Sequence, residues 1–158
     1  MQLTLHTDFA LRALIYLAQK NDRLCTISEI ADFYNISRNH LVKVVHHLST
    51  ENFIQTTRGK HGGMRLARAP EMISVGEVVR RMEPNFDIVE CFSVDNQPCT
   101  VISICALKEV LYQAGNEFLG VLDKYSVADA IKQSERAEHV FSVDQLLNSR
   151  PQNSDHQE

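Results

Sequence analysis

The chain has 158 residues, of which 44% are hydrophobic and 23% are charged, and its formal net charge is −4. This composition supports one packed domain, or one domain with an extension, and excludes a chain that is disordered throughout. No apolar run approaches the roughly 18 residues of a membrane span, and the N-terminus lacks the basic and small-residue features of a signal peptide. We therefore expect a cytoplasmic protein with no membrane partner.

The first predicted elements are helices. Apolar residues recur at helical period over residues 5–19. Thr26 and Glu29 have the spacing of a capping box, which predicts a second helix that ends near Asn35. Ser37 is placed to cap a third helix, which has one apolar stripe and a polar, basic outer face. Two helices joined in this way by a tight turn are typical of a helix-turn-helix.

A two-stranded ribbon is predicted next. Its strands lie at residues 53–56 and 64–66, and the glycine-rich turn RGKHGG joins them. A basic ribbon directly after a helix-turn-helix indicates a winged helix. Ser74 and Glu77 repeat the capping-box spacing and predict another short helix.

A long helix is predicted from about Ile104 to Tyr125. Its apolar residues recur at alternating steps of three and four, a period of 3.5 that is typical of helix-pairing interfaces. We expect a homodimer seam here rather than an ordinary core-facing helix, because few other elements remain to cover the stripe. Ser126 and Asp129 predict one more short helix. The expected seam residues are Leu107, Leu111, Ala114, Phe118, Val121 and Tyr125.

Charge is distributed unevenly along the chain. Residues 38–68 include six basic side chains and a single acid, so this segment carries +5 while the other 127 residues carry −9. A basic segment in an acidic protein is typical of a surface that binds phosphate, whereas a merely solvated face would mix the two signs. The sequence therefore predicts binding to double-stranded DNA.

The third helix would enter the major groove by its N-terminal end. Arg38 would donate two hydrogen bonds to guanine, and Asn39 would pair with adenine. A dimer would present two such helices, so we expect a palindromic operator. The other predicted contacts to bases, phosphates or the minor groove are His40 and Lys43 on the helix and Arg58, Lys60, His61 and Arg65 in the ribbon.

Three of the four cysteines, Cys91, Cys99 and Cys105, lie in one short segment. A reducing cytoplasm disfavours disulfides, and zinc sites commonly use closer cysteine pairs and a fourth Cys or His, which this segment lacks. An iron–sulfur cluster tolerates wider spacing and, in some classes, a ligand other than cysteine. Spacing favours a cluster and leaves zinc, thiol redox chemistry and inert cysteines open. Cys25 stands apart and is expected to be a packed or partly exposed thiol.

The first helix, the segment SRNHLVKVVHHLS, the turn RGKHGGMRLA and the three late cysteines together resemble the NsrR group of nitric-oxide-sensing repressors. This group belongs to the winged-helix family that also contains the iron–sulfur regulator IscR. The resemblance covers roughly residues 1–132. It implies a homodimeric transcriptional repressor, not an enzyme, that releases its operator when nitric oxide nitrosylates an iron–sulfur cluster.

The resemblance also implies the cofactor and its ligands. The cluster would be 4Fe-4S rather than 2Fe-2S, held by Cys91, Cys99, Cys105 and Asp8 of the partner subunit. Without the resemblance, Asp8 would be interpreted as a helix-N-terminal acid paired with Arg12. The histidine ligand of IscR-like proteins has no counterpart between Cys91 and Cys105, which favours the NsrR group. The gap of seven residues between Cys91 and Cys99 is longer than the resemblance leads us to expect for this group.

The predicted fold is mainly α, a winged helix-turn-helix DNA-binding domain plus a long dimerisation helix. We assign residues 1–83 to the DNA-binding domain, 84–105 to a cluster-binding loop, 106–132 to the dimerisation helix and a following short helix, and 133–158 to a partly disordered C-terminal extension. Three alternatives stay open: a regulator that senses iron or cluster supply, a zinc-stabilised or thiol-switch repressor, and a cluster carrier that binds no DNA.

Overall fold

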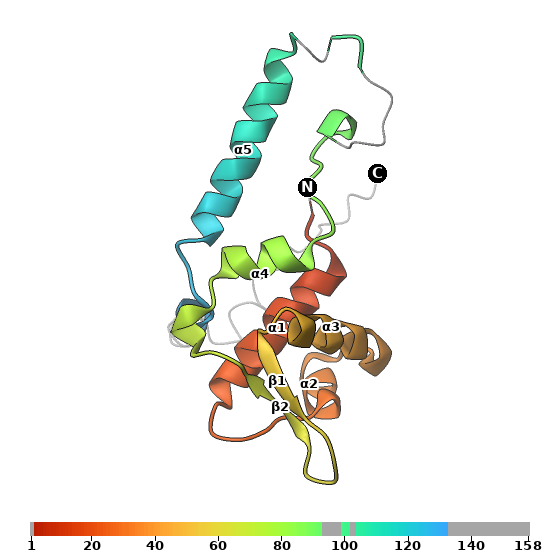
Figure 1. Cartoon of the computed structure of the whole chain (residues 1–158), viewed down its shortest axis with the longest axis vertical. Coiled ribbons are helices and arrows are strands. Elements are labelled where there is room, and N and C mark those ends of the chain that lie inside the picture. The colour runs from red at the N-terminus through yellow and green to blue at the C-terminus, as the bar shows by residue number, and fades with distance from the viewer. Residues whose placement is uncertain (1, 93–98, 102–103, 133–158) are drawn as a thin grey trace, which may run out of the picture.

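The computed structural model describes residues 2–92, 99–101 and 104–132, so the predicted C-terminal extension at 133–158 lies outside the described residues. It is mainly α with one two-stranded sheet, which confirms the predicted fold class (Figure 1). The winged helix-turn-helix is built from α1 (Leu5–Gln19), α2 (Ile27–Tyr34), α3 (Arg38–Thr50), β1 (Ile54–Thr57), β2 (Gly63–Leu66), η1 (Pro70–Met72) and α4 (Val75–Met82). The elements that follow are η2 (Glu90–Phe92), α5 (Ala106–Leu122) and a helical stretch at 127–132.

Local capping chemistry explains most helix boundaries. Thr26 and Glu29 form a complete capping box at the start of α2. Asn35 adopts the left-handed conformation, with φ 52° and ψ 46°, and ends that helix. Ser37 occupies the N-cap position of α3, but its side chain makes no capping hydrogen bond. The prediction of a Ser37 cap was therefore right about where the helix begins and wrong about the side-chain bond.

The core of the winged helix forms around α1. Apolar side chains of α1, α3 and α4 pack against one another and against the residue that enters the ribbon, Phe53. Each fully buried side chain of this size contributes about 1.5–3 kcal/mol relative to exposure. Helix α3 is thus held from behind by the packed core. The largest fully buried side chains are Phe53, Leu14, Leu17, Ile30, Leu41, Leu48 and Ile73.

Polar contacts tie the N-terminus of α1 to the helices around it. His6 Nε2 lies 3.0 Å from Nδ1 of His47 on α3, and the Thr4 amide donates to Glu83 Oε1 at 2.7 Å. Burial and the neighbouring His47 lower the pKa of the His6 imidazole. The first turn of α1 therefore cannot move without disturbing α3 and the end of α4.

The wing depends on two glycines with different roles. Gly59 has φ +115°, a backbone conformation that residues with a Cβ rarely adopt. A Cβ on Gly62 would lie 2.3 Å from the carbonyl oxygen of Thr57, so the turn closes only without one.

Cys25 extends the sheet by exchanging backbone hydrogen bonds with Met64, at 3.0 and 2.8 Å. Its side chain is fully buried, which confirms a packed thiol, and this burial raises the pKa of the thiol.

Helix α5 extends away from this body and meets it mainly at one end (Figure 1). No residue of α5 is buried against the rest of the chain that the structure describes. Leu107, Val110 and Tyr112 expose 63%, 60% and 59% of their surface. Among the described helices, none combines the length and the apolarity that crossing a membrane requires. The predicted helix of residues 104–125 is shorter at both ends. Of the predicted seam residues, Leu107, Val121 and Tyr125 are exposed, whereas Leu111 and Phe118 are half-buried.

Glu29 is the centre of a polar network that joins α1 and α2. Its carboxylate completes the capping box and accepts hydrogen bonds from the Tyr16 hydroxyl at 2.8 Å and the Arg23 guanidinium at 3.1 Å. The bond from Arg23 is the main cause that lowers the pKa of the Glu29 carboxyl to about 2, from an ordinary value of 4.5. The ionised form therefore stabilises the fold above the ordinary value, and this contribution is lost as the pH falls through the lowered one.

The substitution Glu29→Gln is expected to lower the free energy of unfolding by about 1 kcal/mol at neutral pH, because the amide forms no charged pair and the site is partly exposed. The difference from the parent protein should shrink as the pH falls from 4.5 toward 2, where the parent's carboxylate takes up its proton. Urea unfolding of both proteins at several pH values across that range measures the difference in the free energy of unfolding. Glu71→Gln is the control, since Glu71 is exposed and makes no ion pair with the described residues. A difference that stays constant with pH contradicts the assignment.

Candidate functional site

The candidate recognition surface begins at the N-terminal end of α3. Arg38, Asn39 and His40 form the first turn, and Lys43 follows on the same helix. All four side chains are exposed, while Leu41 and other apolar residues of α3 face the core. The helix thus separates a buried face from a polar, basic face, as its sequence predicts.

The ribbon lies next to this end of α3. A cleft of about 260 Å³ lies between the start of α3, the start of α2 and the two strands. Because one cleft borders both elements, the N-terminal end of α3 and the wing form one continuous surface. The four wing residues predicted to contact DNA, Arg58, Lys60, His61 and Arg65, are all exposed. The residues that line the cleft include Arg38, Ser28, Thr56, Thr57 and Gly62.

Most basic side chains on this surface have no acidic partner. Within the described ranges, the salt bridges involve none of the eight predicted DNA contacts. Arg65 donates only to the neutral Gln55 amide oxygen, at 3.3 Å. Arg68 differs, because it pairs with Glu77 at 2.9 Å and stacks over the Phe53 ring. The part of the basic segment that precedes Arg68 therefore presents uncompensated positive charge, which attracts phosphate.

Three hydroxyl residues at this surface were not predicted from the sequence as DNA contacts. Ser28 in the first turn of α2, and Thr56 and Thr57 on β1, line the cleft beside Arg38. Hydroxyls beside a basic helix commonly donate to DNA phosphates. Their proximity to Arg38 depends on how the ribbon folds back, and spacing along the chain did not reveal it.

The three clustered cysteines lie near the far end of the molecule from the wing. Cys91 belongs to η2 and Cys105 occupies the N-cap position of α5, and both thiols are half-buried. Cys99 is exposed. All three are free thiols. The residues between them at 93–98 and 102–103 are outside the described part of the chain.

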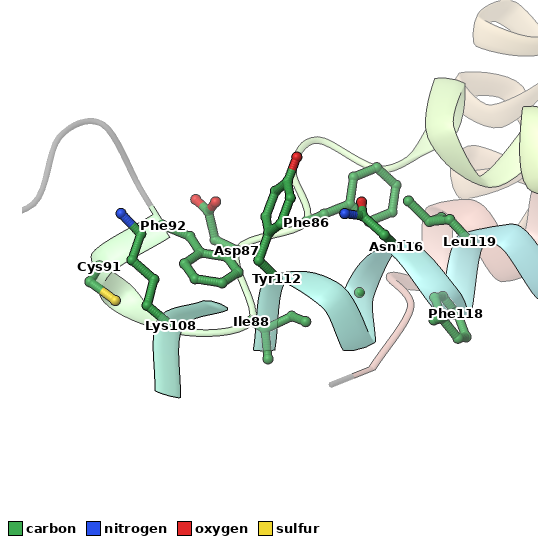
Figure 2. A pocket seen from close by; sticks show the side chains of 11 residues that line it. Phe86, Asp87, Ile88, Cys91, Phe92, Lys108, Tyr112, Asn116, Phe118 and Leu119 are labelled. Atoms are coloured by element: carbon green, nitrogen blue, oxygen red, sulfur yellow. The ribbon is translucent and has the colours of Figure 1, made fainter. Parts of the chain in front are cut away.

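Cys91 borders a pocket between the segment that contains η2 and the inner side of α5 (Figure 2). The pocket has a volume of about 340 Å³ and a mainly apolar lining. Phe92 and Tyr112 meet edge to face across it, with ring centroids 6.4 Å apart. Gly115 leaves room for the Ile88 side chain, which would lie 3.2 Å from a Cβ there. This packing places the cysteine segment against α5.

The donor set fits an iron–sulfur group by its chemistry, since three uncrosslinked thiols at a surface are suitable ligands. In the described portion of one chain, however, no three His, Cys, Asp or Glu side chains are gathered as metal ligands. Asp8, the predicted fourth ligand, is paired with Arg12 through a 2.9 Å bond within its own helix. Ligation by Asp8 and the three cysteines therefore stays a prediction.

The comparisons with known proteins identify the family. Residues 3–133 match the model of the Rrf2 family, which is described as an iron-dependent transcriptional regulator. The HTH-type transcriptional regulator NsrR of Bacillus licheniformis is 45% identical over 143 residues, which cover 90% of this chain and all of that protein. NsrR of Bacillus subtilis is 46% identical over 136 residues, which cover 85% of this chain and 93% of that protein.

Solved structures agree with this result at the level of the fold. The structure of T. potens IscR superposes with a TM-score of 0.71 at 24% identity, and the match covers 87% of this chain and 91% of that one. The resemblance to the NsrR group that the sequence motifs indicate is confirmed. This chain belongs to the Rrf2 family of DNA-binding transcriptional regulators and is not an enzyme.

Proposed function

We propose that this chain is a homodimeric repressor that senses nitric oxide through an iron–sulfur cluster and then releases a palindromic operator. The observation that carries the proposal is the set of three free thiols, Cys91, Cys99 and Cys105, placed near the N-terminal end of a helix with exposed apolar side chains. The similarity to NsrR proteins supports nitric oxide as the signal.

The apolar face of α5 supports the homodimer. Its exposed side chains, among them Leu107, Val110 and Val121, follow the helix over most of its length. Monomeric soluble proteins rarely expose a contiguous apolar patch of this kind, and a second copy of the same helix would cover it symmetrically. In the proposed dimer, α5 pairs with α5 of the second copy.

The proposed ligands are Cys91, Cys99 and Cys105 of one subunit and Asp8 of the partner subunit. A 4Fe-4S cluster bound by them would supply iron that reacts with nitric oxide. Thiolates are strong ligands of iron, whereas a single carboxylate is a weaker one. Of these four residues, Asp8 is therefore the one expected to change partners most readily.

Asp8 has an alternative partner in its own chain. The Arg12 guanidinium lies 2.9 Å from its carboxylate, at the i,i+4 spacing that stabilises helices. Release of Asp8 from the other subunit therefore leaves no unpaired charge, because Arg12 takes up the contact. Asp8 would then exchange between a contact across the dimer and a contact within α1.

The first turn of α1 transmits this exchange to the DNA-reading helix. His6, two residues before Asp8, contacts His47 of α3 directly, and α1 packs along α3 in the core. A contact across the dimer at Asp8 would hold both α3 helices at the spacing of the operator. A coupling of about 1–3 kcal/mol is enough to change DNA affinity some 5- to 150-fold.

A second candidate function is sensing of iron or of cluster supply. The description of the matching family as iron-dependent favours it. The same ligands and the same DNA surface would serve, but the signal would be loss of the cluster rather than its reaction with nitric oxide. Operator affinities of the loaded and metal-free forms, compared without nitric oxide, separate the two functions.

The recognition helix and the wing are expected to contribute differently to operator binding. Arg38→Ala should weaken binding about 5- to 150-fold and relax the preference at one base pair, as loss of a bidentate base contact does. Lys60→Ala should weaken binding to all DNA sequences alike. It should also reduce the slope of log binding constant against log salt concentration by about 1 per wing. Binding titrations at several salt concentrations measure both effects. Lys124→Ala, an exposed lysine outside the basic segment, is the control, and equal behaviour of all three variants would refute the assignment.

The cysteine assignment predicts a visible difference between two single substitutions. Protein purified without air is expected to be coloured and to contain iron. Cys99→Ser should lose both, since the exposed Cys99 would be a ligand and its replacement disturbs no packing. Cys25→Ala should keep both, because Cys25 is a buried structural thiol. Colour and iron that survive in Cys99→Ser, or vanish equally in Cys25→Ala, would argue against this ligand set.

The role of Asp8 is tested by comparing it with its intrahelical partner. Asp8→Ala should reduce operator affinity in the cluster-loaded dimer, because the contact across subunits is lost. Arg12→Ala removes the same ion pair but leaves Asp8 free to act as a ligand, so it should bind the operator at least as tightly as the parent. Fluorescence anisotropy with labelled operator provides both affinities. Equal losses in the two variants would show that only the ion pair matters.

A further inference from the structure

The joint between α5 and the winged helix is built from backbone hydrogen bonds. The Val75 amide donates to the Tyr125 carbonyl at 2.9 Å, and the Val127 amide donates to the Ile73 carbonyl at 2.9 Å. Ser74 and Ser126 lie opposite each other in an antiparallel bridge. The chain therefore leaves α5 along the N-terminal end of α4.

One side-chain pair braces this joint. Arg80 on α4 donates to both carboxylate oxygens of Asp123, which caps the C-terminal end of α5, at 2.5 and 2.6 Å. Two parallel bonds between a planar guanidinium and a carboxylate define direction as well as distance. The bonds from Arg80 also lower the pKa of the Asp123 carboxyl.

A glycine makes room for the pair. A Cβ on Gly76 would lie 2.1 Å from Asp123 Oδ1 and 2.9 Å from the Asp123 backbone nitrogen. Any larger residue at position 76 would therefore push the end of α5 away from α4. The sequence thus combines a glycine, an arginine one turn later, and an aspartate 43 residues beyond that arginine at a single contact.

The position of this contact gives it a mechanical effect on DNA reading. In the proposed dimer α5 is held by α5 of the second copy, so a rotation at the joint moves the winged helix and its helix α3 instead. A rotation of about 10° moves a point about 20 Å from the joint by about 3.5 Å. That displacement is similar to the rise of one base pair, about 3.4 Å, and in a two-fold dimer each joint adds its own displacement.

We propose that Arg80 and Asp123 are positioning residues for operator recognition. Their ion pair fixes the angle between α5 and the winged helix, and so determines the spacing of the two half-sites that the dimer accepts. This inference rests on the proposed dimer, in which α5 pairs with α5 of the second copy. Neither residue contacts DNA in this arrangement, so their effect is on spacing and not on base preference.

The ordinary alternative is a surface ion pair with little effect, because both partners are partly exposed. The neighbouring residue Arg81 provides a matched comparison. It pairs with Glu51 at 3.5 Å, is more exposed than Arg80, and makes its contact within the winged helix rather than with α5. Arg80→Gln and Arg81→Gln change the net charge equally and differ in whether the joint is affected.

The test is a selection of DNA in which two fixed half-sites are separated by every spacing over one helical turn. The full-length, cluster-loaded dimer is used, and thermal melting checks that each variant is folded. The parent protein and Arg81→Gln should enrich one spacing alike. Arg80→Gln should reduce the enrichment of that spacing over its neighbours one base pair away by about threefold. Gly76→Ala, which displaces Asp123 by a second route, should broaden or shift the preferred spacing.

Two results would overturn the inference and leave the proposed function standing. In the first, Arg80→Gln and Gly76→Ala both select spacings as the parent does. In the second, Arg81→Gln broadens the selection as much as Arg80→Gln, so that charge and not the joint is responsible. A parent protein that enriches no paired half-sites overturns the proposed function itself and the inference with it.

Discussion

The apolar face of α5 is the constraint on which the rest of the structure depends. The helix carries large apolar side chains along its length and buries none of its residues against the described part of its own chain. Exposed apolar surface of this extent requires a partner, and the symmetry of a homodimer is the simplest way to provide one. The cysteine segment lies at one end of this helix and the joint to the winged helix at the other, so pairing through α5 would place both relative to the second copy.

The winged helix, in contrast, is complete in one chain. Its core surrounds α1 and holds α3 from behind, while the basic residues of α3 and the wing remain exposed.

Much of the fold follows from local signals in the sequence. The bounds of α1, the capping box of α2 and the basic ribbon were predictable because helix caps, glycine turns and hydrophobic period act over a few residues. The backbone carbonyl of Ser37 accepts the first helical bond of α3, from Leu41, but the Ser37 side chain makes no capping hydrogen bond. Exposure of the four predicted DNA contacts on α3 was also predictable, since an amphipathic helix turns its polar face outward.

The contacts that couple the parts were not predictable. The pair between Arg80 and Asp123, the contact of His6 with His47, and the pocket beside Cys91 each join segments far apart in the chain. Spacing along a sequence carries no signal for such contacts, because they depend on how whole elements pack. The candidate cluster site has the same character. The sequence supplies three thiols, but their assembly around a shared group, and the role of Asp8 across the dimer, depend on the second copy.

The central claim is that a nitric-oxide-reactive group held by these thiols controls how tightly the dimer binds its operator. The most direct measurement is operator affinity in anaerobically prepared, iron-loaded protein during stepwise addition of nitric oxide, with iron content and visible absorption followed in the same sample. Operator affinity is expected to fall as the absorption changes and to level off when the iron has reacted fully. Operator affinity that stays constant after complete reaction, or that is equally high in colourless protein without iron, would contradict it.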